Sequence, residues 1–192
     1  MILTDSAILK SIENGELVVK NCREDYLQNT SWDVRLGKNL FVVEVIDLDE
    51  SYFSEGVINP KNKDTVNYQP KVIDLNGGVI YPNRLYLGVT TEYFEFNKSL
   101  AGTVDGVSSL GRLGVSVHQT AGYCDEGFKG HVTLEITTVY PFILYPNMII
   151  GQMVFHRTEG QVTNPYNKKK INYCNECSDN PFPIPSNYHL KF

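Results

Sequence analysis

The sequence HVTLEIT, at residues 131–137, decides the fold class because apolar and polar residues alternate along it. Successive side chains of a β-strand point to opposite faces, so this run is predicted to be a strand with one apolar face. That face carries Val132, Leu134 and Ile136, and the other carries Thr133, Glu135 and Thr137. A carboxylate so placed is usually solvated. If the face lines a pocket instead, Glu135 is suited to take a proton from water and return it.

Short runs with strand character fill most of the remaining sequence. Turn-forming residues separate them, as in Asn76-Gly77-Gly78 and Tyr145-Pro146-Asn147. The predicted strands cover residues 17–19, 33–36, 40–48, 79–81, 85–95, 114–119, 131–139, 142–144 and 149–156. So many short strands within 192 residues predict an all-β sandwich, jelly roll or barrel.

One short amphipathic helix is predicted near the start of the chain. Thr4 or Asp5 can cap its first turn, and Gly15 is suited to end it. Its apolar face is expected to hold Ile8, Leu9 and Ile12.

The composition is that of an ordinary globular protein, with 42% apolar and 20% charged residues. A single domain over residues 1–192 can bury a core without metals or disulfides. The net charge of −5 argues against binding DNA or RNA, because clustered Lys and Arg bind phosphate backbones. Neither a secretory signal nor an apolar run long enough to span a bilayer is visible, which predicts a cytoplasmic protein that does not bind membranes.

The last stretch, residues 164–192, changes character, with Lys168-Lys169-Lys170 followed by three spaced prolines. It is either a frayed terminus or a tail that closes on a ligand or on a neighbouring subunit. Cys174 and Cys177 have a spacing that suits two zinc ligands. A structural zinc site wants four ligands, and no second Cys or His pair lies nearby, so we predict no zinc.

Two further segments carry residues suited to binding a ligand. Residues 106–114, GVSSLGRLG, combine hydroxyls, glycines and Arg112, which suits phosphate oxygens, although such short motifs are weak evidence alone. Residues 117–130 form a strand, a small-residue turn and an acidic turn flanked by glycines. Asp125 in that turn can orient a sugar hydroxyl, bind water or simply cap the turn.

Together and in this order, the motifs resemble the dCTP deaminase branch of the dUTPase-like superfamily. The resemblance rests on residues 106–114, 118–130, 133–135 and 146–155, and it extends upstream through residues 33–37 and the predicted helix. It implies a distorted jelly-roll subunit and a homotrimer with active sites between subunits. It also implies that dCTP or dUTP binds with Mg²⁺ held through the triphosphate rather than by the protein. For dCTP, the resemblance further implies that water attacks C4 of the base without a protein-bound metal.

The resemblance also implies a role for each matched residue. Glu135 is the proton shuttle, Ser108 holds the water or the leaving amine, and Arg112 contacts the pocket and the phosphates. The backbone near Thr120 and Ala121 borders the base, Asp125 lies by the deoxyribose, and Tyr166 reaches the phosphates. The other substrate-binding residues that it implies are Ser109, Gln152 and Lys170.

Three positions depart from the family pattern. Val107 stands where the family usually has Arg, and each charge-assisted hydrogen bond that an Arg makes is worth about 1.5–3 kcal/mol. In the tail, Asn172 and Glu176 replace the expected Lys and Gln, although Lys168 to Lys170 can supply charge. A modified cytosine or a different phosphate state therefore stays open as the substrate.

The main hypothesis is hydrolytic deamination of dCTP to dUTP and ammonia. It is zinc-independent, because the H-x-E and P-C-x-x-C motifs of the zinc deaminases are missing around His118, His131 and Cys174. Residues 121–125 and 151–152 resemble the bifunctional enzyme and dUTPase, in which the Asp of the acidic turn helps a water to attack the α-phosphorus. Such a second step would carry the reaction on to dUMP and pyrophosphate. The alternatives are a plain dUTPase, against which Glu135 argues, and a non-catalytic nucleotide-binding regulator, which Val107 keeps open.

Overall fold

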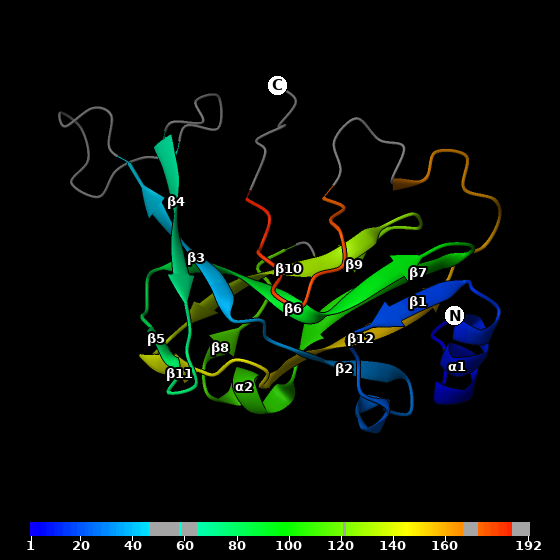
Figure 1. Cartoon of the computed structure of the whole chain (residues 1–192), viewed down its shortest axis with the longest axis horizontal. Helices are drawn as coiled ribbons and strands as arrows, with labels where there is room; N and C mark the ends of the chain where they lie inside the picture. Colours follow the sequence, from blue (N-terminus) through cyan, green and yellow to red (C-terminus); the bar gives the residue numbers. More distant parts are fainter. Residues whose placement is uncertain (47–57, 59–64, 121, 167–172, 186–192) are drawn as a thin grey trace.

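The computed structural model describes residues 1–46, 58, 65–120, 122–166 and 173–185. Within them the chain is built mainly from antiparallel strands in two larger sheets and a small one, which confirms the all-β prediction (Figure 1). The first sheet has the order β4 (Val66–Val72), β3 (Asn39–Val45), β6 (Leu85–Phe96), β10 (Lys129–Thr138) and β8 (Val115–Ser116), with β1 (Leu17–Lys20) also pairing with β6. The second has β2 (Ser31–Arg35), β12 (Ile149–Arg157), β7 (Leu100–Gly106) and β9 (Tyr123–Cys124). The third pairs β11 (Phe142–Leu144) with β5 (Gly78–Ile80). The helical segments are α1 (Asp5–Glu13), η1 (Glu24–Tyr26) and α2 (Ser108–Arg112).

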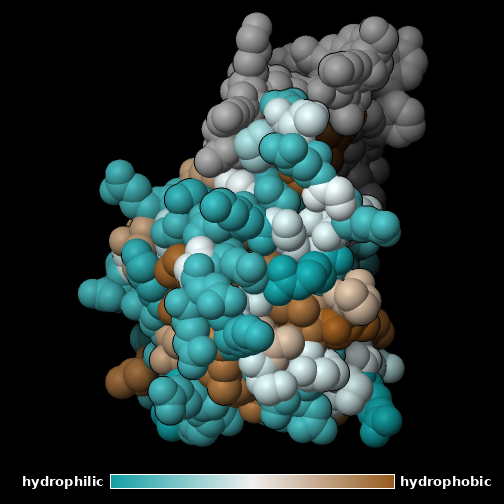
Figure 2. Space-filling model, turned by 90° about the vertical axis from the view of Figure 1, so that its right-hand side faces the viewer, coloured by the Kyte–Doolittle hydropathy of each residue, from teal (hydrophilic) through white to brown (hydrophobic). Residues whose placement is uncertain are grey.

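The core lies between the two larger sheets. Phe94 and Phe96 of β6 are fully buried and meet Phe155 of β12, with ring centroids 6.2 and 6.1 Å away. Phe128, before β10, extends the cluster, 6.4 Å from Phe96. Burial of these four aromatic rings therefore holds the first sheet to the second. On the surface, polar side chains cover most of the face seen in Figure 2, and apolar ones gather there in smaller patches.

The alternation predicted for residues 131–137 is confirmed in β10. Leu134 and Ile136 are fully buried and Val132 is 6% exposed, whereas Thr133, Glu135 and Thr137 are half-buried on the opposite face. The strand pairs antiparallel with β6, so that Glu135 lies opposite Leu87. One face of β10 thus packs on the core, and the other remains accessible to a ligand.

The predicted N-terminal helix is confirmed as α1, and Gly15 follows it with a φ of +70°. One detail of the prediction was wrong. Leu9 is 45% exposed, because it lies one residue beyond Ile8 and a helix turns about 100° per residue; Ser11 takes its place on the buried face. Thr4 is the N-cap residue, as predicted; its side chain contacts Ser6, and the backbone N–H of Ser6 donates to Asp5 Oδ1 at 2.7 Å.

Several strands differ from the predicted ones. The strand predicted over residues 40–48 ends at Val45, and residues 47–48 lie outside the described part of the chain. The one predicted over residues 114–119 contains only β8. Strands β4, β7 and β9 and the helix α2 were not predicted, because Gly, Pro and Asp obscure the local pattern and tertiary pairing overrides it. Among the described residues, no helix is long and apolar enough to cross a membrane.

Candidate active site

A cavity of about 400 Å³ lies against the accessible face of β10. Its polar wall carries Glu135, Thr133, His118 and Asp125. Its apolar wall is formed by Val43, Tyr68, Leu85, Leu87, Phe128 and Ile184, among others. A concave, largely apolar site with a few converging polar groups is typical of a small-molecule site.

The Glu135 carboxylate binds the backbone turn that follows β8. Its Oε2 accepts hydrogen bonds from the backbone N–H of Gln119 at 3.0 Å and of Thr120 at 3.2 Å. The side chain is 29% exposed. Among the described residues, the hydrogen bonds to this carboxylate all go to Oε2, so Oε1 is available to a bound molecule. Two fixed N–H donors therefore orient a carboxylate at the edge of the cavity, as a proton shuttle requires.

His118 is a neighbour of this carboxylate that the sequence did not single out. Its Nδ1 lies 3.9 Å from Glu135 Oε2, too far for a hydrogen bond. Burial lowers the pKa of His118, while the charges of Glu135 and Asp105 act in the opposite direction. Neither ring nitrogen has a hydrogen-bond partner within the described part of the chain. The only signal in the sequence was its place directly before Gln119 and Thr120.

The acidic turn and the start of the tail form one corner of the cavity. Asp125 lines it, and Gly127 makes the turn with a φ of +91°. The backbone N–H of Tyr166 donates to the carbonyl of Glu126 at 2.9 Å, and its ring packs on Phe128, 6.0 Å between centroids. Burial raises the pKa of Tyr166. Asp125 and Tyr166, both predicted site residues, are therefore brought together.

The tail continues along β10. Asn175 makes two hydrogen bonds with the backbone of His131. Its Oδ1 accepts from the His131 N–H at 2.8 Å, and its Nδ2 donates to the His131 carbonyl at 3.3 Å. Gly130 makes this approach possible, since a Cβ there would lie 2.9 Å from the Asn175 Oδ1. Farther on, the Ile184 N–H donates to Thr133 Oγ1 at 2.9 Å. Tyr166, Tyr173 and Ile184 of the tail thus line part of the cavity of their own chain.

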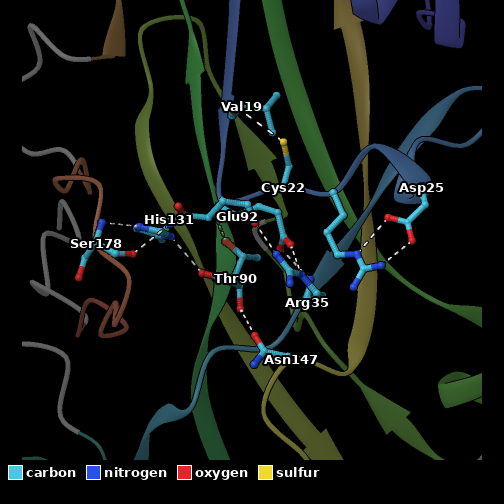
Figure 3. Close-up of polar contacts among 12 residues, drawn as sticks. Val19, Cys22, Asp25, Arg35, Thr90, Glu92, His131, Asn147 and Ser178 are labelled. Atoms are coloured by element: carbon cyan, nitrogen blue, oxygen red, sulfur yellow. Dashed lines mark hydrogen bonds and ion pairs between the residues drawn. The ribbon is translucent and has the colours of Figure 1, made fainter.

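Beneath this contact lies a buried polar network (Figure 3). His131 is 1% exposed, with Nδ1 3.1 Å from the Thr90 carbonyl and Nε2 accepting from the Ser178 N–H at 3.1 Å. Burial lowers the pKa of His131, which favours the neutral ring that this arrangement needs. Arg35 and the fully buried Glu92 form an ion pair at 2.6 Å in the same region.

Ser108 lies in a different cavity, of about 440 Å³, which also contains Asp105 and Val107. His118 lines both cavities. Ser109 and Arg112 are exposed on α2. The structure therefore does not bring Ser108 and Arg112 into the Glu135 cavity of the same chain. Val107 is half-buried and packs against the core.

The other predicted site residues have separate positions. Gln152 of β12 accepts a hydrogen bond from the Ser31 hydroxyl at 3.1 Å and does not line the Glu135 cavity. Thr120 contributes its backbone N–H to Glu135. Ala121 and Lys170 lie outside the described residues.

Within the described part of the chain, none of the four cysteines, Cys174 and Cys177 included, forms a disulfide. In the described part of the chain, no group of three or more His, Cys, Asp or Glu side chains is placed to hold a metal ion. A Mg²⁺ bound through phosphate oxygens and water does not need such a group.

Comparison with known proteins adds a consistent set of relatives. A family model described as dCTP deaminase-like matches residues 2–158. A protein of Corynebacterium glutamicum (strain R) named "dCTP deaminase, dUMP-forming" is 34% identical over 195 residues, covering 100% of this chain and 98% of the relative. Proteins with the same name from Methanobrevibacter smithii and Coprothermobacter proteolyticus are 33% and 37% identical, covering 99% and 88% of this chain and 98% and 89% of their own lengths.

Among solved structures, the 2'-deoxycytidine 5'-triphosphate deaminase from Agrobacterium tumefaciens matches with a TM-score of 0.59 and 21% identity. The match covers 80% of this chain but 47% of that one, so the chain spans about half of its length. At this level of identity the likeness concerns the fold, and it agrees with the predicted distorted jelly roll.

Proposed function

The chain belongs to the dCTP deaminase-like family, and from that premise we propose that it hydrolyses the C4 amine of dCTP and converts the product to dUMP. The observation that carries the proposal is the Glu135 carboxylate, oriented by two backbone N–H groups at the edge of the cavity. The names of the relatives support the dUMP-forming outcome.

In the first reaction, Glu135 takes a proton from a water molecule that attacks C4 of the cytosine ring. A C–O bond forms, C4 becomes tetrahedral, and its double bond to N3 becomes a single bond as Glu135 passes the proton to N3. Glu135 then takes the remaining hydroxyl proton and gives it to the exocyclic nitrogen, the C–N bond breaks, and ammonia leaves as the C4 carbonyl forms. The fixed position of the carboxylate saves reorganisation in these proton transfers.

The second reaction uses the acidic turn, whose Asp125 lines the same cavity as Glu135. We assign to Asp125 the activation of a water for attack on the α-phosphorus of dUTP, which releases pyrophosphate and leaves dUMP. Its position beside Tyr166, at the start of the tail, supports a role near the sugar and phosphates. The substrate enters as its Mg²⁺ complex.

We also propose a homotrimer whose active sites are shared between chains. Ser108 and Arg112 lie outside the Glu135 cavity of their own chain, so a second copy has to supply them if they contact the same nucleotide. Both ring nitrogens of His118, which lines the two cavities, lack a hydrogen-bond partner among the described residues, and this supports an additional contact there. Closed symmetric assemblies of identical chains commonly build sites in this way.

The activity is tested by incubating the protein with Mg²⁺ and dCTP or dUTP, and by resolving ammonia, dUTP, dUMP and pyrophosphate. Ammonia and pyrophosphate together are expected from dCTP. Ammonia alone would indicate a strict deaminase, pyrophosphate from dUTP alone a dUTPase, and binding without product a regulator. Glu135→Gln should abolish ammonia release, because the amide cannot accept the proton from water.

The shared site is tested by mixing two inactive variants, Glu135→Gln and Ser108→Ala, after unfolding and refolding together. If each site takes Ser108 and Glu135 from different chains, about a quarter of the sites in a random mixture are intact, and activity returns. Separately refolded variants are the control. A mixture that stays inactive would contradict sharing between these two residues.

A further inference from the structure

An apolar surface beside Glu135 forms part of the apolar wall of its cavity. It consists of Leu87, Leu85, Val43 and Tyr68, and we call it the apolar shelf. Glu135 of β10 lies opposite Leu87 of β6, and farther along the sheet Leu85 lies opposite Val43, which in turn lies opposite Tyr68. Directly paired residues have Cβ atoms about 4.5–5.5 Å apart, so the shelf begins one strand away from the carboxylate.

The other flank of Glu135 is polar. There the backbone N–H groups of Gln119 and Thr120 meet the carboxylate, and the Glu135 N–H itself donates to the carbonyl of Val117 at 3.0 Å. Peptide groups on one side and leucine side chains on the other make the surroundings of the carboxylate strongly asymmetric.

A cytosine ring has a matching asymmetry. The C4 amine lies between N3, which leads to the polar O2, and C5, which leads to the apolar C6. If C4 is next to Glu135, one flank of the carboxylate receives N3 and the other receives C5. Placing N3 and O2 against leucines would leave two acceptors without partners, which is costly. Physical complementarity therefore turns C5 toward the shelf.

Space for a group on C5 is available there. Val43 and Leu85 are half-buried, so part of their apolar surface still faces the cavity. Ile184 of the tail lines the same cavity, held by the hydrogen bond of its N–H to Thr133. A methyl group at C5 would cover this apolar surface without displacing a polar contact of Glu135.

We propose that the substrate class of this site includes cytosine deoxynucleotides with a small apolar group at C5, 5-methyl-dCTP first among them. The inference rests on the proposed function, because only a deaminase needs C4 at Glu135. It goes beyond that function because it assigns the shelf as the surface that recognises the C5 side of the base.

The direct test compares ammonia release from dCTP, 5-methyl-dCTP and 5-hydroxymethyl-dCTP in the presence of Mg²⁺. We expect kcat/KM for 5-methyl-dCTP to lie between that of dCTP and about four times that value, the factor that burial of one CH₂ supplies. The hydroxymethyl compound should have a lower kcat/KM than the methyl compound, because its hydroxyl lies against leucines.

A kcat/KM for 5-methyl-dCTP at least ten-fold below that for dCTP, with normal activity on dCTP, would overturn this inference alone. Absence of ammonia from all three would overturn the proposed function and this inference with it.

Two matched variants test whether the apolar shelf determines the relative kcat/KM for 5-methyl-dCTP and dCTP. Leu85→Phe fills the space, and we expect it to lower the ratio of kcat/KM for 5-methyl-dCTP over dCTP by about ten-fold, as overpacking implies. Leu9→Phe, at a residue of α1 that is 45% exposed and outside the cavity, should leave the ratio unchanged. Equal losses for both substrates in Leu85→Phe would refute the role of the shelf. If that variant does not fold, Leu85→Ala opens the same space and should raise the relative activity on 5-propynyl-dCTP; an unchanged ratio would again refute it.

Discussion

The buried ion pair between Arg35 and Glu92 offers a sharp test of how the fold is held together (Figure 3). Arg35 Nε donates to Glu92 Oε1 at 2.6 Å, and the Arg35 backbone N–H donates to Oε2 at 2.7 Å. The Glu92 side chain is 0% exposed and that of Arg35 14%. The pair links β2 of one sheet to β6 of the other. Removal of one partner would leave the other charge buried.

Arg35→Met removes the guanidinium and keeps most of the apolar stem. Breaking a buried pair in this way costs about 3–5 kcal/mol, which corresponds to a fall in Tm of about 6–20 °C for a chain of this size. Thermal unfolding followed by circular dichroism at one fixed protein concentration measures this fall. The concentration must be fixed because assembly also shifts Tm.

The pH dependence identifies the cause of the loss. Burial raises the pKa of Glu92, and the hydrogen bonds and charge of Arg35 act against that rise. Without Arg35, the pKa in the folded state rises further above its value in the unfolded chain. The folded variant then binds a proton that the unfolded chain does not, so the deficit in Tm should shrink as the pH falls from 8 toward 5.

Two further variants complete the test. Arg35→Met combined with Glu92→Leu removes both charges and should recover more than half of the lost stability. Arg23→Met breaks the exposed contact with Asp25 and should leave Tm unchanged within error, because water screens that pair. The reasoning is refuted if Arg35→Met costs no more than Arg23→Met, or if the double variant is less stable than the single one.

Two other predictions concern the tail and its contact with β10. Burial lowers the pKa of His131 below its ordinary value of 6.5, so the unfolded chain binds a proton first and stability should fall as the pH drops below about 6.5. His131→Gln should make this slope shallower in urea titrations at several pH values, since the amide can still face Thr90 and Ser178 without titrating; an unchanged slope would exclude His131 as its source. Gly130→Ala places a Cβ 2.9 Å from Asn175 Oδ1 and should loosen the tail. We expect faster amide exchange at Ile184 and a raised KM for dCTP, whereas protection equal to the wild type would contradict the proposed role of this contact.

Local patterns in the sequence were sufficient for much of the fold. The alternation in residues 131–137 predicted β10 with its buried face, and the capping and glycine signals predicted α1. They failed at β7, Leu100–Gly106, where Gly and Asp conceal a strand that pairing with β12 and β9 stabilises. They also failed at Leu9, where a small error in helical phase moved a side chain from the core to the surface.

The residues of the candidate site were likewise expected from the sequence in part and revealed by the structure in part. The resemblance to the dCTP deaminase family pointed to Glu135, Asp125 and Tyr166, which the structure gathers around one cavity. The one signal for His118 was its place directly before Gln119 and Thr120, and only the structure shows that it lines both cavities.

By itself, the sequence determined the all-β class, the family, and the identity of the residues with suitable chemistry, because strand periodicity and motif order are properties of neighbouring residues. Only the tertiary structure decided whether the face that carries Glu135 meets solvent or lines a cavity. That outcome depends on Leu87 of a neighbouring strand and on Ile184 of the tail, both about fifty residues from Glu135 along the chain and brought to it only by folding. The same packing separates Ser108 from Glu135 within one chain, a distinction that no local pattern contains.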